Sequence, residues 1–294
     1  MRRMESAQRA FEHCAWMVRE GDYVGYLCAA ALPARARVGA LAIRAFALET
    51  RQPTSRDAPL AQLRLEWWKQ AVDDTYAGRP PSHPVALSIA ALLEEQNEEK
   101  RMRLTRGWFK RIVDGRSEEV ERGGNVPSLD ELERHAERCF SAMHYLVLEC
   151  AEVRHSAAHH AASHLGAAEG LVDSLRRAHV RPGAMPSSIL AQFGASQEDI
   201  RRGENREALA MAAQEVAEQA VAHIERGRAL AVQMPPGTAK RALLPTVACA
   251  AWLNSLRKVN FDLFHPRLRA GSGLAVPPVL LQARLWWNAF RETY

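Results

Sequence analysis

Four histidines in one stretch are the most obvious candidate for a metal site. His155 and His159 are four residues apart, as are His160 and His164, so each pair lies on one face of a helix in the manner of zinc ligands. On a helix of 3.6 residues per turn the two pairs point about 100–140° apart. No cysteine or carboxylate lies at a spacing that would complete a site, so we expect no bound metal.

A basic stretch contains a second candidate, an anion site made of arginines. Arg177 and Arg181 are one helical turn apart, with Arg176 beside them, so their guanidinium groups could hold a phosphate or a carboxylate directly. Alternatively, these arginines are exposed near the C-terminus of a helix, where the helix dipole stabilises positive charge. The spacing by itself leaves both interpretations open.

Adjacent tryptophans mark two further segments. Residues 63–76 form an amphipathic pattern in which Trp67 or Trp68 packs in the core, an interpretation that we favour over stacking on a ligand. Trp286 and Trp287 are also adjacent, so we expect one to face inward and the other outward. Because exposed tryptophan is frequent at interfaces, this segment could cover a cavity, dock on a partner or rest on a membrane surface.

The short motifs of common nucleotide-binding and hydrolase sites are missing. The chain contains no G-x-x-x-x-G-K-[ST], G-x-G-x-x-G, H-E-x-x-H or G-x-S-x-G, and we expect no cofactor. Its five cysteines are scattered and form no C-x-x-C pair. That pattern indicates a reducing compartment rather than a disulfide framework or a zinc knuckle.

Helices must position these groups, because apolar residues recur at helical spacing along nearly the whole chain. The 294 residues, 47% hydrophobic and 25% charged, are typical of a soluble globular protein. A net charge of +5, with basic clusters at 101–111 and 176–181, favours solvated helix faces over an RNA site. The longest apolar runs, 24–33 and 276–281, are too short to span a membrane.

Glycine, proline and polar clusters divide the chain into about ten helices. We expect one domain over residues 1–294, with its core at about 20–260 and an aromatic C-terminal helix at 276–294. Residues 114–128, rich in Gly and Glu, are predicted to form an exposed loop. Ser128 followed by Glu131 is typical of a capping box at a helix start, and Ser196 with Asp199 is a weaker example.

Several stretches resemble the squalene/phytoene synthase family, whose members are all-α prenyl transferases. The likeness lies in residues 41–46, 63–68, 78–85, 165–168 and 175–186. Within the family the chain is most similar to the mitochondrial complex I assembly factor 6 branch, through residues 160–170, 194–199, 259–266 and 286–294. The resemblance implies a single-domain helical bundle of the isoprenoid-synthase type.

Active synthases of this family bind magnesium diphosphate with two D-x-x-x-D motifs, whose carboxylates at i and i+4 ligate the metal together. Aligning both motifs on this chain places Arg51 and Ser55 at the first pair of acid positions, and Arg177 and Arg181 at the second. A divalent ion about 4 Å from one guanidinium meets a repulsion of about 2–8 kcal/mol. Without the metal, the departing diphosphate loses its main stabilisation. The resemblance therefore implies a catalytically inactive protein.

The branch also implies a role as an assembly factor for respiratory complex I. Its partners would be proteins of a mitochondrial assembly intermediate, in the matrix or in peripheral contact with the matrix face of the inner membrane. One alternative is an assembly factor for another mitochondrial complex, such as the mitoribosome, where nucleic acid is met only indirectly through a ribonucleoprotein. Another is an enzyme that retains a prenyl-diphosphate-binding cavity.

Overall fold

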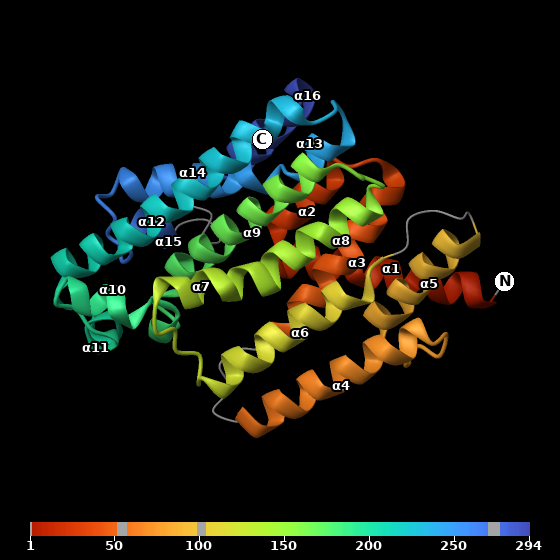
Figure 1. Ribbon diagram of the computed structural model, residues 1–294, viewed down its shortest axis with the longest axis horizontal. Helices are drawn as coiled ribbons and strands as arrows, with labels where there is room; N and C mark the ends of the chain where they lie inside the picture. The colour runs from red at the N-terminus through yellow and green to blue at the C-terminus, as the bar shows by residue number, and fades with distance from the viewer. Residues whose placement is uncertain (1, 52–57, 99–103, 270–276) are drawn as a thin grey trace.

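Helices form all the regular structure in the described part of the chain, which a computed structural model gives for residues 2–51, 58–98, 104–269 and 277–294; no strand occurs within these ranges (Figure 1). The α-helices are α1 (Arg2–Gly21), α2 (Tyr23–Ala30), α3 (Ala34–Thr50), α4 (Ala58–Tyr76), α5 (Pro84–Glu98), α6 (Arg106–Glu121), α7 (Leu129–Ala136), α8 (Ala142–Cys150), α9 (Ser156–Arg177), α10 (Ser187–Gln192), α11 (Gln197–Arg202), α12 (Arg206–Ala229), α13 (Thr238–Ala242), α14 (Pro245–Arg257), α15 (Pro266–Arg269) and α16 (Pro278–Arg291). A π-helical turn, η1 (Glu137–Ser141), joins α7 to α8, and 3₁₀ turns occur at η2 (Pro182–Ala184) and η3 (Leu230–Gln233). The all-α prediction is confirmed.

The number of helices exceeds the ten or so expected, because α10, α11, α13 and α15 are only four to six residues long. Periodicity of 3.6 residues needs a longer window to be visible in sequence. The loop expected at 114–128 is wrong over its first half, since α6 continues to Glu121. Gly115 favours close packing there: a Cβ at this position would lie 2.7 Å from Cys139 Sγ.

Among the described residues, oxygen-bearing side chains cap the starts of α2, α7 and α11. The backbone N–H of Gly25 donates to Asp22 Oδ1 at 2.9 Å, at the start of α2. Ser196 and Asp199 form a complete capping box at α11. At α7 only half of the box expected from the sequence forms: the N–H of Glu131 donates to Ser128 Oγ at 3.3 Å, but the Glu131 carboxylate pairs with arginines instead. The stronger sequence signal therefore gives the weaker cap.

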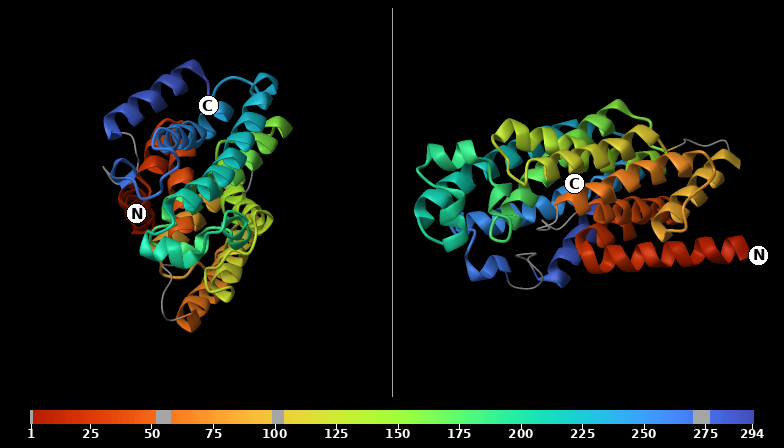
Figure 2. Two further views of the ribbon diagram at one scale, coloured as in Figure 1. Left: turned by 90° about the vertical axis from the view of Figure 1, so that its left-hand side faces the viewer. Right: turned by 90° about the horizontal axis from the view of Figure 1, so that it is seen from below.

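The central helix is α9, which packs against α12 on one side and against the rod α7–η1–α8 on the other (Figure 1). Helix α6 packs on this rod, and α4 packs on α6. The right-hand view of Figure 2 shows α1 along the lower edge of the molecule. Gly166 and Gly170 of α9 permit the close approach of the rod, because a Cβ at either position would overlap Ser141 or Ala136.

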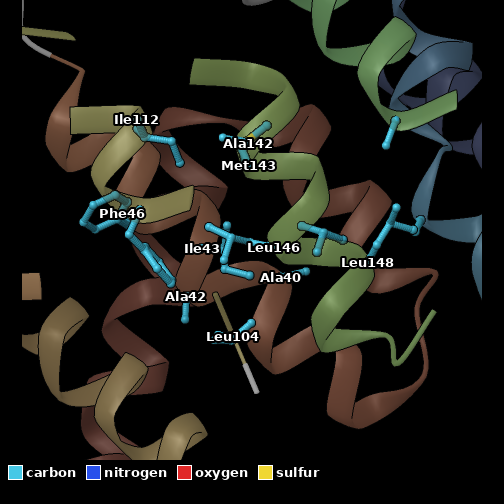
Figure 3. Close-up of a cluster of buried hydrophobic side chains, with 14 of the residues drawn as sticks. Ala40, Ala42, Ile43, Phe46, Leu104, Ile112, Ala142, Met143, Leu146 and Leu148 are labelled. Carbon is cyan, nitrogen blue, oxygen red and sulfur yellow. The ribbon is translucent and has the colours of Figure 1, made fainter. Parts of the chain in front are cut away.

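Three large apolar clusters and a small one, made of Ala136, Cys139 and Phe140, form the interior of the described structure. The first surrounds Phe46 (Figure 3). The Phe46 ring meets the rings of Trp68 and Phe109 edge to face, with centroids 5.2 and 5.0 Å away. The second lies between the C-terminal half of α9 and helices α10–α12 and α14. The third packs Leu281 and Leu285 of α16 against α2 and α14. Trp68 is therefore the core tryptophan of α4.

Candidate functional site

A cavity of about 100 Å³ lies where the three apolar clusters meet. Helices α3, α9, α14 and the π-helical turn η1 line most of it, and Leu281 of α16 closes one side. Its walls include apolar side chains such as Met143 and Trp252, but the polar lining is almost entirely charged. The charged lining residues are Asp22, Arg44, Arg51, Arg116, Glu169, Asp173 and Arg176.

Arg44 is the most deeply buried of these charges, with 5% of its side chain exposed. Its Nη1 donates to Asp22 Oδ2 at 2.6 Å and lies 4.0 Å from Glu169. Burial disfavours the guanidinium, but Asp22 and Glu169 more than compensate and raise the pKa of Arg44. Asp22 thus caps α2 and anchors α3 at the same time. Glu169 also binds His144 Nε2 at 2.6 Å.

Asp173 accepts hydrogen bonds from two arginines that come from different parts of the chain. Arg51, directly after α3, pairs with its Oδ1, and Arg177, one turn along α9, donates to its Oδ2 at 3.3 Å. Burial by itself raises the pKa of Asp173, yet Arg51 and Arg177 hold it well below its ordinary value. Burial also lowers the pKa of Arg177 to about 10. This carboxylate is therefore ionised and engaged on both oxygens.

Glu119 is the centre of an adjoining cavity of about 40 Å³. Arg116 Nη1 donates to it at 2.9 Å, and Arg181 Nη2 lies 2.7 Å away on its other oxygen. Burial opposes ionisation here too, but the arginines keep the pKa of Glu119 far below its usual range. Burial and the neighbouring Arg116 lower the pKa of His135 to about 4, so this histidine is neutral at physiological pH.

The two cavities together carry an excess of positive charge. Seven arginines but only four carboxylates line them: Arg44, Arg51, Arg116, Arg122, Arg176, Arg177 and Arg181 against Asp22, Glu119, Glu169 and Asp173. Arg122 is further balanced by Glu131 at 2.9 Å. Within the described residues, Arg51, Arg116 and Arg181 each leave a buried Nε with no hydrogen-bond partner. A site that binds anions has these features: buried N–H donors without an acceptor, and more guanidinium groups than carboxylates around them.

The arginines singled out in the sequence gather at this site. Arg51, Arg177 and Arg181 lie in the ion-pair network, and Arg176 lines the larger cavity. The alternative of solvent-exposed arginines at a helix end is wrong, since the Arg177 and Arg181 side chains are only 21% and 9% exposed. Ser55 lies outside the described residues.

The four candidate histidines do not gather into one site. His159 stacks on Tyr145, whereas His164 reaches His223 of α12, with their Nδ1 atoms 3.1 Å apart. Across the described ranges, no group of three or more histidine, cysteine or acidic side chains is placed to hold a metal ion. The zinc hypothesis has no geometric support here.

Sequence reasoning missed the acidic half of the network. Glu169 and Asp173 are four residues apart on α9, a spacing that places both carboxylates on one face. That signal was available in the sequence. Arg177 lies four residues after Asp173, but the pairing with Arg51 leaves no local signal, because Arg51 and Asp173 are 122 positions apart.

Trp286 and Trp287 differ from the expectation that one faces inward. Both are 59% exposed, because α16 turns Leu281 and Leu285 to the interior. Among the described residues, no helix combines the length and apolar character needed to cross a bilayer.

Comparison with known proteins places this architecture. Residues 18–272 match the squalene/phytoene synthase family. The chain is 34% identical over 288 residues to bovine "NADH dehydrogenase (ubiquinone) complex I, assembly factor 6", covering 96% of this chain and 82% of that protein. The human protein of the same name is 33% identical, and the match again covers 96% of this chain and 82% of that protein. The Drosophila melanogaster homologue is 31% identical, and the match covers 96% of this chain and 84% of that protein.

Solved structures share the same fold. A ligand-bound dehydrosqualene synthase aligns with a TM-score of 0.79 at 17% identity, covering 98% of this chain and 99% of that one. The squalene synthase HpnC of Alicyclobacillus acidocaldarius aligns with a TM-score of 0.72 at 17% identity, covering 88% and 99%. The resemblance inferred from the sequence is confirmed, and the chain belongs to the squalene/phytoene synthase family.

Proposed function

We propose that this chain is a non-catalytic assembly factor for respiratory complex I. Relatives that match it over 96% of its length carry the name complex I assembly factor 6. Proteins that share a fold need not share chemistry, because activity depends on the site. The proposal therefore depends on what occupies the cavity.

The single observation that carries the proposal is the arginine-rich ion-pair network. Arg51, Arg177 and Arg181, which our sequence alignment places at acid positions of the family's two D-x-x-x-D motifs, each pair with an acid. A divalent cation would have to displace guanidinium groups from Asp173 and Glu119 and then remain beside them. At about 4 Å each such neighbour costs it about 2–8 kcal/mol. Both D-x-x-x-D metal motifs are, on this proposal, lost together with prenyl transferase activity.

The partners in this proposal are proteins of a complex I assembly intermediate. The site of action is the mitochondrion, in the matrix or on the matrix face of the inner membrane. Nucleic acid is met only indirectly, if the client complex is a ribonucleoprotein. The names of the relatives support complex I over that alternative.

The cavity favours a second, compatible role in holding an anion. Arg176 lines it with no carboxylate placed against it in the described structure, and the Nε atoms of Arg51 and Arg181 point to no acceptor there. A phosphate or carboxylate group would supply acceptors to Arg176, Arg177 and Arg181. Such a ligand would be bound without metal, and could be a lipid or a prenyl diphosphate.

Gene deletion with complementation tests the proposed function. Loss of the gene should remove fully assembled complex I from native gels while other respiratory complexes persist, and the wild-type chain should restore it. Affinity purification of the tagged chain should recover complex I subunits or their intermediates. Normal complex I in the deletion strain, or recovery of mitoribosomal proteins alone, would contradict the proposal.

A further inference from the structure

Helix α16 is held rigidly against the body of the protein. Leu281 and Leu285 are 2% and 0% exposed and pack in the cluster that joins α2 and α14. The chain end fixes the helix again: the Tyr294 hydroxyl donates to the Gly227 carbonyl at 2.9 Å, and Arg228 Nε donates to the Tyr294 carbonyl at 2.7 Å. The position of α16 is thus set by the contacts of its inner face and by those of the chain end that follows it.

The opposite side of this helix, here called the outer face of α16, presents large apolar side chains to solvent. Its members are between 54% and 79% exposed: Val279, Leu280, Trp286, Trp287 and Phe290. At 100° per residue they occupy an arc of about 120°, centred roughly opposite Leu281 and Leu285. The helix therefore has two apolar faces, and only one of them is satisfied by packing.

Positive charge borders the outer face. Arg284 and Arg291 fall along one edge of the apolar arc, and the Arg291 guanidinium lies 5.8 Å from the Trp287 ring. From position 266 to the last residue the sequence contains four arginines and a single acid, Glu292. Tryptophan at an apolar–polar boundary, flanked by arginine, matches the chemistry of an anionic bilayer surface, where indole rings lie at headgroup depth.

We propose that the outer face of α16 seats this protein on the surface of a bilayer that contains anionic lipid. The apolar side chains enter the boundary between headgroups and acyl chains, while Arg284 and Arg291 reach lipid phosphates. A protein groove would fit this face only if acidic side chains lined the one edge that meets Arg284 and Arg291. An anionic bilayer carries negative charge everywhere on its surface, so the helix can bind it however it is turned within the plane of the membrane. The inference depends on the proposed function for the identity of the membrane, not for the binding itself.

Vesicle co-sedimentation of the full chain tests this assignment. The probes are phosphatidylcholine vesicles with and without one third phosphatidylglycerol. Wild type should pellet with the anionic vesicles and far less with the neutral ones. The triple variant Trp286→Ser, Trp287→Ser, Phe290→Ser should bind at least about tenfold more weakly. The double variant Arg284→Gln, Arg291→Gln should lose about 25-fold on anionic vesicles, about fivefold per arginine, and little on neutral ones.

A matched control uses apolar residues of similar exposure elsewhere. Trp16 and Leu63 are 60% and 67% exposed on α1 and α4, so Trp16→Ser with Leu63→Ser should bind like wild type. Circular dichroism melts should show all variants folded, because every changed side chain is exposed.

The proposal is overturned if the wild-type protein does not bind anionic vesicles, or if the triple variant binds them as well as wild type does. If wild type does not bind vesicles and the triple variant no longer binds a protein partner that wild type binds, the outer face is a protein interface and the proposal is overturned. Normal complex I in a deletion strain would refute only the proposed function, since vesicle binding is measured on the isolated chain.

Discussion

Helix α3 contributes side chains to two regions that are stabilised differently: an apolar cluster and a charged cavity. Ile43 and Phe46 enter the first apolar cluster (Figure 3), whereas Arg44 and the later Arg51 line the charged cavity. In the first region the attraction is non-directional and many contacts share it. In the second, each charge depends on one or two named partners. The core therefore spreads a small error of shape over many contacts, whereas each acid of the cavity depends on its own arginine partners.

The charges of the cavity are coupled to one another more tightly than the side chains of the core. Breaking a buried ion pair leaves an uncompensated charge, so single changes in such a network are strongly disfavoured. In the described part of the chain, each buried acid of the cavity is therefore paired with at least one arginine, while the surplus arginines keep donors free.

The largest effect should come from the apolar region. Phe46→Ala removes a fully buried ring that meets Trp68 and Phe109, and the free energy of unfolding should fall by about 4 kcal/mol. Urea unfolding at pH 7 and at pH 5 should give the same loss, because no titratable group is involved. The milder Phe46→Leu is the matched control, and a loss that depends strongly on pH would show that the two regions are coupled.

A loss of about 3 kcal/mol at pH 7 is expected for Asp173→Asn, which leaves Arg51 and Arg177 without their shared carboxylate. The folded-state pKa of Asp173 is depressed, so its stabilisation is present above the unfolded pKa near 4 and disappears as the pH falls below that value. Urea unfolding should therefore show the wild-type and variant stabilities converging in acid. Asp74→Asn, at an exposed pair with Arg79, serves as control. An equal deficit at pH 7 and pH 3 would refute the paired-network account.

Protonation of His135 should give a smaller, pH-restricted effect. Burial and Arg116 lower its pKa to about 4 in the folded state, against about 6.5 unfolded. The unfolded state therefore binds the proton first, and the stability contributed by neutral His135 declines as the pH falls below about 6.5. The linkage amounts to about 2 kcal/mol between pH 8 and pH 5. His135→Gln should flatten this part of the stability curve, and an unchanged slope would contradict the assignment.

The smallest effect should be seen at the surface. Arg64 pairs with Glu49 with 46% of its side chain exposed, so Arg64→Gln should change the free energy of unfolding by less than about 1 kcal/mol. The change should shrink further in high salt. A loss as large as that of Asp173→Asn would show that burial does not distinguish the two kinds of pair.

Much of the fold followed from local patterns in the sequence. Helical periodicity predicted the all-α class and a core role for Trp67 or Trp68, and aspartate and glycine marked the break between α1 and α2. The break between α8 and α9 was missed, because it contains no glycine or proline and instead places Glu152 at a φ of +57°. Turns that depend on tertiary contacts leave no such residue signal.

The site was predictable only in part, for a similar reason. The basic stretch around Arg177 and Arg181 is local, and so is the spacing of Glu169 and Asp173. Which acid meets which arginine depends on how α3, α6 and α9 pack, and this is set by contacts across more than a hundred positions. The outward direction of both Trp286 and Trp287 is likewise decided by the inner contacts of α16.

Calorimetric titration of the full chain with farnesyl diphosphate, with and without millimolar magnesium and coupled to an assay for released diphosphate, tests the central claim most directly. If guanidinium groups replace the metal in this cavity, magnesium should not strengthen binding and no diphosphate should be released. Magnesium-dependent binding followed by turnover of farnesyl diphosphate would contradict the account, because it would require a carboxylate-held metal within the same walls.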